Sequence, residues 1–94
     1  MKEKEMPYIK KERRPYLETN TLELASLLKN MGNGVPENGD VVYVLYLLVK
    51  ELYGYGNFDT KSDALKVLES AKIEYYRRIM ADYEDKKIIE NGDI

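Results

Sequence analysis

Residues 41–53 read VVYVLYLLVKELY and contain the longest apolar run of the chain. Every residue from Val41 to Val49 is apolar, so a helix here presents apolar side chains on nearly every face. The β-branched and aromatic residues are also compatible with a strand. A helix is favoured because Asp40 is a good N-cap, Gly54 follows as a stop, and no partner strand is evident. We therefore predict a helix over 41–53 that is buried on all sides.

A helix is predicted on each side of this stretch. Pro15 suits the first turn of a helix over 15–31, because its missing N–H costs nothing there. Apolar residues then recur in it at helical spacing: Leu17, Leu24, Leu27, Leu28 and Met31. Asp59 or Thr60 is expected to cap a helix over 60–82. One side of that helix is apolar over Ala64, Leu65, Leu68, Ala71, Tyr75, Ile79 and Tyr83.

The chain end is predicted to be helical as well. After a break, a short helix over 84–90 should end at the Asn91-Gly92 pair, which is typical of a helix stop. Residues 1–14 show no periodicity and are expected to form a flexible basic arm. We therefore predict an all-α fold for residues 1–94, a single domain with a three-helix core and a short C-terminal helix.

Helix lengths favour a homo-oligomer. The helix over 60–82 spans about 33 Å and the helix over 41–53 only about 20 Å, so the shorter cannot cover the longer. Three helices also struggle to surround a helix that is apolar on all sides. A second subunit would solve both problems.

Composition excludes several classes of function. Among 94 residues there is no cysteine and no histidine, which removes disulfides, thiolate chemistry, histidine bases and the commonest zinc ligands. The net charge of −2 makes a general nucleic-acid binder improbable. No signal peptide is visible, and the longest apolar run is far too short to cross a bilayer. We expect a cytoplasmic protein with no membrane partner.

The sharpest candidate site lies in the last quarter of the chain. Tyrosine and arginine dominate interface energetics, and arginine also captures phosphate in a bidentate manner. A partner interface or an anion site is therefore expected at Tyr75, Tyr76, Arg77, Arg78, Tyr83, Glu84, Asp85, Asn91 and Asp93. The alternative is structural: the tyrosines pack, and the arginines pair with Glu74 and nearby acids. Weaker candidates for phosphate or base contacts lie in the basic arm, at Tyr8, Lys10, Arg13 and Arg14.

No catalytic, metal or cofactor site is predicted. Acids three residues apart, at 37/40, 82/85 and 90/93, lie at expected helix ends or turns. A magnesium site needs carboxylates that converge from two elements, and these pairs do not supply one. A metal-dependent hydrolase built on the C-terminal acids is therefore only a third hypothesis.

Several segments resemble a small family of unknown function found in bacteria and their phages. They are Met6-Pro7-Tyr8-Ile9, Gly39-Asp40 before an apolar helix, and above all LESAKIEYYRR followed by YEDKKIIENGD. The resemblance covers about half of the chain and implies that Met6 is the usual start. It also implies a signature made of Glu74, Tyr76, Arg77, Arg78, Tyr83, Glu84, Asp85, Asn91, Gly92 and Asp93. The family often has proline before Tyr83, where this chain has Asp82.

The first functional hypothesis is a non-enzymatic helical oligomer that acts by binding. In this reading the Tyr-Arg-Arg region and the tail contact another subunit or a protein partner. The second hypothesis is a binder of an anionic, nucleotide-like molecule between subunits, without any other cofactor. The phage association implied by the resemblance would point to host regulation, by analogy alone.

Overall fold

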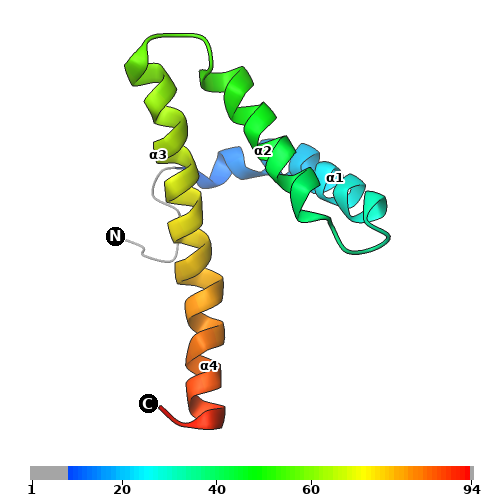
Figure 1. The fold of residues 1–94 in the computed structure, drawn as a ribbon, viewed down its shortest axis with the longest axis vertical. Coiled ribbons are helices and arrows are strands. Elements are labelled where there is room, and N and C mark those ends of the chain that lie inside the picture. The colour runs from blue at the N-terminus through cyan, green and yellow to red at the C-terminus, as the bar shows by residue number, and fades with distance from the viewer. Residues whose placement is uncertain (1–8, 94) are drawn as a thin grey trace. The chain divides into compact units, whose positions relative to one another are not determined.

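The structure is a computed structural model that describes residues 9–93, and in that range it contains helices and no strand (Figure 1). A 3₁₀ turn at Lys11–Arg13 leads into α1 at Arg14–Met31. The further helices are α2 at Asn38–Tyr53, α3 at Phe58–Tyr75, a π turn at Tyr76–Met80, and α4 at Ala81–Asn91. The all-α prediction is confirmed. Contacts divide the chain into two units, Met1–Leu45 and Tyr46–Ile94, which are described separately.

The first unit holds α1, which begins one residue earlier than predicted. Pro15 lies in its first turn, as expected from the missing N–H. The helix ends at Gly32, and the N–H of Gly34 donates to the carbonyl of Lys29 at 2.8 Å. Asn33 and Gly34 have positive φ values of 58° and 102°, so this turn uses the two residue types that tolerate that region. Because the 3₁₀ turn and α1 begin at Lys11 and Arg14, residues 11–14 are helical, although they were expected to belong to the flexible arm.

The start of α2 differs from the prediction. The helix begins at Asn38, and the N–H of Val41 donates to the carbonyl of Glu37 at 3.2 Å. Asp40 is thus in the first helical turn and is not the N-cap. The acid still suits this position, because the first turn of a helix favours negative charge.

The second unit contains α3, which is capped two residues before the predicted position. The side chain of Asn57 accepts a hydrogen bond from the backbone N–H of Thr60 at 3.0 Å. The backbone of Asn57 is extended, and its side chain pairs with one of the unbonded N–H groups of the first turn, as N-cap residues do. The predicted caps, Asp59 and Thr60, lie inside the helix.

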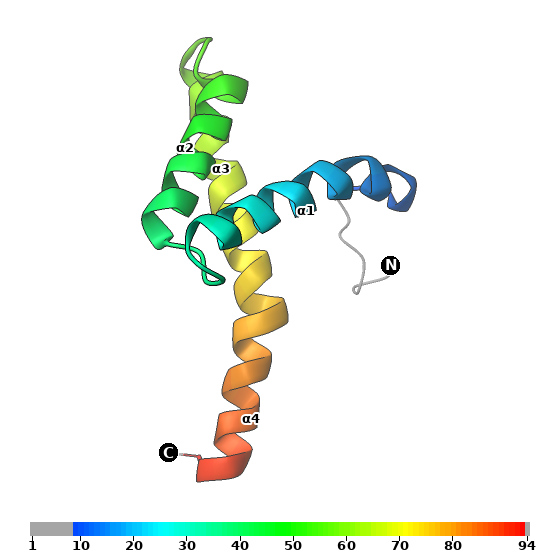
Figure 2. The same cartoon turned by 90° about the vertical axis from the view of Figure 1, so that its right-hand side faces the viewer.

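The break that was expected after Asp82 is absent. The helical backbone continues from α3 through the π turn into α4, as Figures 1 and 2 show. Residues 58–91 therefore form one helical rod of about 50 Å at 1.5 Å per residue. Asp82 lies in the first turn of α4, where an acid is favourable, and does not interrupt the helix.

The helix stop at the chain end is confirmed. Asn91 is the last residue of α4, and the N–H of Gly92 donates to the carbonyl of Ile88 at 2.8 Å. Gly92 has a φ of 84°, which glycine adopts without strain. The same Glu-Asn-Gly-Asp sequence therefore opens α2 and ends α4.

No residue in the range 9–93 is buried. The least exposed apolar side chains include Leu28 in α1, Val44 and Val49 in α2, and Leu68 in α3, and these are only half-buried. Large apolar residues of α2 that are at least 40% exposed are Val42, Tyr43, Leu45, Tyr46, Leu47, Leu48 and Leu52. The helices thus form without an enclosed core of their own.

Candidate interaction site at the π turn

The centre of the candidate site is a π turn inside the long helix of the second unit. The N–H of Ala81 donates to the carbonyl of Tyr76, five residues earlier, where an α-helix would use a residue four earlier. Single π turns inside helices occur frequently at functional sites. Here the turn has the sequence YRRIM, so it coincides with the tyrosine-arginine cluster singled out from the sequence.

Glu74 holds both arginines of the cluster. Its carboxylate accepts hydrogen bonds from Arg77 Nη2, at 3.2 Å to each oxygen, and from Arg78 Nε. The Glu74 side chain is only 12% exposed, whereas that of Arg77 is 54% exposed. The hydrogen bond from Arg78, aided by Arg77, holds the pKa of the Glu74 carboxyl below its ordinary value of 4.5. The predicted Glu74–Arg78 pair is confirmed.

Tyr76 connects the π turn to α4. Its hydroxyl donates to Glu84 Oε1 at 2.8 Å, across eight residues. This hydrogen bond, together with the negative charge of Glu84, raises the pKa of the Tyr76 hydroxyl above 10.0. Seven residues make about two turns of an α-helix, and the extra residue of the π turn extends that spacing to eight.

The π turn also decides which side chains line up along the rod. In α3 the apolar stripe contains Ala64, Leu68, Ala71 and Tyr75. Residues four apart share a face in an α-helix, but the step across a π turn is five. The next residue of the stripe after Tyr75 is therefore Met80, and Tyr83 lies three residues beyond Met80. The sequence pattern assumed an unbroken α-helix and placed Ile79 in this stripe.

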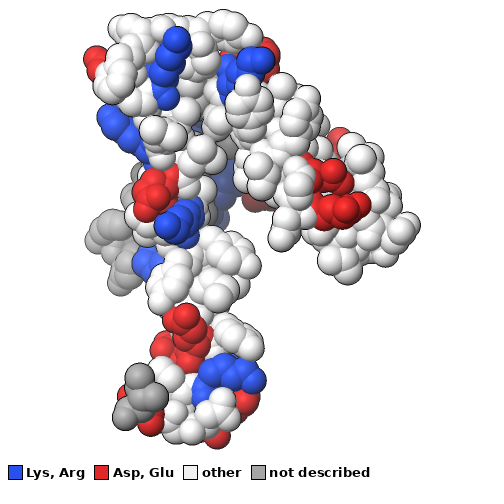
Figure 3. Space-filling model, in the orientation of Figure 1, with Lys and Arg blue, Asp and Glu red and all other residues white. Residues whose placement is uncertain are grey.

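Charges along α4 form ion pairs on its surface. Lys86 contacts Asp82 and Lys87 contacts Glu90, each at 3.3 Å. Lys87 also lies 5.7 Å from the ring centroid of Tyr83. Figure 3 shows acidic and basic side chains next to one another on the lower part of the drawn face, where Figure 1 has α4. These exposed pairs add little stability individually.

The structure brings some of the predicted site residues together and leaves others apart. It joins Arg77 and Arg78 to Glu74, and it separately joins Tyr76 to Glu84. Asn91 lies at the end of α4 and Asp93 beyond it, two turns from Glu84. In the other unit, Lys10 precedes the 3₁₀ turn, Arg13 is the last residue of that turn, and Arg14 begins α1. Tyr8 lies outside the described residues.

The described residues offer neither a cluster of metal ligands nor a membrane-spanning helix. Residues 9–93 contain no group of three or more His, Cys, Asp or Glu side chains that would hold a metal ion. Within the same range, none of the helices combines the length and apolar character needed to cross a membrane. Asp82 and Glu90 of α4 instead contact lysines of the same helix, and Glu84 accepts a hydrogen bond from the Tyr76 hydroxyl.

Comparison with known proteins gives one match. Residues 6–94 match the family described as domain of unknown function DUF6899. The chain belongs to this family. No curated protein and no solved structure matches the chain. The match covers nearly the whole chain, so α1 to α4 all lie inside the family's domain.

One feature of the site could not be seen in the sequence. The Tyr76–Glu84 hydrogen bond needs the π turn, and a wheel drawn at 100° per residue cannot show it. The pairing of both arginines with Glu74 was the structural alternative that the sequence offered, and the structure contains both contacts. This pairing follows from spacing, since residues three and four apart are both neighbours on a helix.

Proposed function

We propose that this chain is a non-enzymatic helical protein that acts by binding, and that it works as a homo-oligomer. The observation that carries the proposal is the absence of any buried residue from 9 to 93, in a chain whose central helix is apolar on nearly every face. The interface would include the cluster at the π turn and α4. A further protein partner would then meet the assembled oligomer.

Exposed apolar area is the driving force for this assembly. Removing apolar surface from water contributes roughly 25 cal/mol per Å². Large contiguous apolar patches on soluble proteins mark interaction sites. Seven large apolar side chains of α2 are at least 40% exposed, and the stripe of the rod adds Tyr75 and Tyr83, both more than half exposed.

A second copy of the chain is the occupant that fits these faces best. A helix that is apolar all round must be covered on every side. α2 is about 24 Å long and the rod over 58–91 about 50 Å, so α2 cannot cover the apolar stripe along its whole length. In a symmetric homo-oligomer every subunit has the same apolar faces, so the faces of one subunit can cover those of another and the assembly is closed.

Binding of an anion by the arginines is less well supported. Arg77 and Arg78 already donate to Glu74, so an anionic ligand would have to compete with that carboxylate. A hydrolase built on the C-terminal acids likewise lacks convergent carboxylates among the described residues. We further propose a cytoplasmic location and, by analogy with the bacterial and phage family that the sequence resembles, a role linked to host regulation.

The proposal is tested by placing a charge on α2. Val42 is 64% exposed, so Val42→Asp should change the folding of an isolated chain by no more than about 0.5 kcal/mol. In an assembly that covers α2, the buried carboxylate would cost about 2 kcal/mol or more per copy. We expect the mass of Val42→Asp in sedimentation equilibrium to fall toward that of a single chain.

Asn20→Asp is the matched control, because it adds the same charge at an exposed polar position of α1. It should sediment like the unmodified chain. Circular dichroism at 222 nm should show similar helix content for all three proteins. An unmodified chain that sediments as a monomer at every concentration would contradict the proposal.

A further inference from the structure

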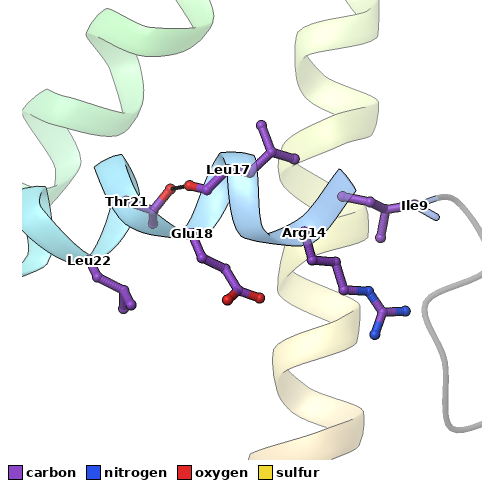
Figure 4. Close-up of a pocket in the computed structure, with 6 residues that line it drawn as sticks. All are labelled: Ile9, Arg14, Leu17, Glu18, Thr21 and Leu22. Atoms are coloured by element: carbon purple, nitrogen blue, oxygen red, sulfur yellow. Dashed lines mark hydrogen bonds between the residues drawn. The ribbon is translucent and has the colours of Figure 1, made fainter. Parts of the chain in front are cut away.

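A shallow depression lies on α1 and the residues before it. Its volume is about 250 Å³, and it is lined by Ile9, Arg14, Leu17, Glu18, Thr21 and Leu22. Figure 4 shows Arg14, Glu18 and Leu22 leaving the same side of the helix, one turn apart. The depression therefore combines aliphatic walls with one guanidinium and one carboxylate.

Arg14 lacks a partner in this depression. Its Nε is shielded from solvent and has no hydrogen-bond partner among the described residues. Glu18 lies one turn further along α1, but no ion pair joins it to Arg14 in residues 9–93, and Figure 4 shows the guanidinium extending away from it. Arg14 as a residue is only half-buried, and a carboxylate is the strongest partner for its guanidinium.

The charge around the depression is complementary to that of α4. Residues 9–14 carry four basic side chains and one acidic, which gives +3. Residues 82–93 carry five acidic side chains and two basic, which gives −3. Opposite patches of this kind steer association and fix its register.

One face of α4 carries two side chains that suit the depression. Asp85 makes no ion pair with any described residue, and Ile89 is 83% exposed. They are four residues apart and thus share a face of α4. By the register argued above, this face lies away from the stripe that contains Tyr83. The depression can accommodate this pair, because its guanidinium would bind the carboxylate and its aliphatic walls would contact the isoleucine.

We propose that the depression on α1 binds α4 of a second copy of this chain, with Asp85 on Arg14 and Ile89 against the aliphatic wall. The inference rests on the proposed homo-oligomer and specifies one of its contacts. In a two-fold dimer the contact forms twice, because each subunit presents both surfaces. Two reciprocal contacts strengthen an interaction that is weak as a single exposed pair.

Charge exchange between two chains tests the contact. R14E and D85R should each weaken the dimer about tenfold, since two unfavourable pairs form in every dimer. An equimolar mixture of R14E and D85R should restore assembly, because both contacts of the mixed dimer then join opposite charges. The readout is the dissociation constant from sedimentation equilibrium, with native mass spectrometry to identify the mixed dimer.

Two further proteins complete the design. K61E reverses a charge of the same sign at an exposed position of α3 and should leave the dissociation constant unchanged. The doubly substituted chain R14E/D85R should assemble by itself. Circular dichroism would verify the helix content of each protein, so that misfolding is not read as loss of contact.

The remaining outcomes overturn the inference in separable ways. Single variants that assemble like the unmodified chain would remove the contact and leave the homo-oligomer standing. Single variants that dissociate, are not rescued by mixing, and recover in R14E/D85R would place the contact within one chain. An unmodified chain that is monomeric would instead overturn the proposed function itself.

Discussion

Glu74 is the residue on which the cluster at the π turn depends. It is the shared acceptor for Arg77 and Arg78, and its side chain is mostly shielded from solvent. Charge-assisted hydrogen bonds to a carboxylate are stronger than neutral ones. The arginines are therefore held in place before any partner arrives, which lowers the entropic cost of ordering them in an interface.

This arrangement predicts a dependence of stability on pH. The folded chain depresses the pKa of Glu74, so the stabilisation is fully present above the ordinary value of 4.5 and is lost as pH falls through the lowered pKa. Thermal unfolding followed by circular dichroism, from neutral pH to about pH 3, should show this loss. Glu74→Gln should be less stable than the unmodified chain at neutral pH, and the difference should shrink in acid.

Glu69→Gln is the control, because Glu69 lies on α3 without an ion pair in the described residues. A Glu74→Gln chain that loses as much stability on acidification as the unmodified chain would show that Glu74 is not the titrating group. A Glu69→Gln chain should follow the unmodified chain throughout.

At the scale of elements, the sequence predicted the helices well and their junctions poorly. Apolar spacing gave α1 almost to the residue and gave α2 and α3 with starts shifted by two or three residues. The predicted N-caps were wrong because several residues close together in the sequence can each cap a helix, as Asn57, Asp59 and Thr60 can. A break was expected after Asp82, where the resembling family often has proline, but an acid at that point is also favourable in the first turn of a helix.

No pattern in the sequence predicted the π turn. One inserted residue shifts every later side chain by about 100°, so the stripe assigned from the sequence was correct up to Tyr75 and off by one at Ile79. The tyrosine-arginine cluster was located correctly. Its link to Glu84 was not predictable without the turn.

We expect opposite effects from two single-residue deletions in the helix over 58–91. Removing Ile79 from the π turn should yield a regular α-helix that keeps Tyr75, Met80 and Tyr83 on one face, with assembly retained. Removing Ala71 from α3 should rotate the stripe before the deletion by about 100° relative to the rest and weaken assembly. Sedimentation equilibrium measures both.

Each deletion serves as the control for the other, since both shorten the rod by one residue. Circular dichroism should report equal helix content within error. Loss of assembly on removing Ile79, with Ala71 dispensable, would contradict the proposed continuity of the stripe.

At the scale of the whole molecule, the chain has strong helical order and no buried residue in the range 9–93. Ordering a backbone costs about 1–2 kcal/mol per residue, and apolar burial is the main term that offsets it. Helices that bury so little within their own chain would be marginal in water. The proposed second copy would account for this by covering α2 and the stripe.

Native mass spectrometry of the full chain is the decisive experiment for the proposed homo-oligomer. We expect an integer multiple of the 11.0 kDa chain at micromolar concentration, without additional bound mass. A single species at 11.0 kDa under the same conditions would contradict the homo-oligomer. A multiple that carries the extra mass of a small molecule at each site would instead support the anion-binding alternative over the proposed function.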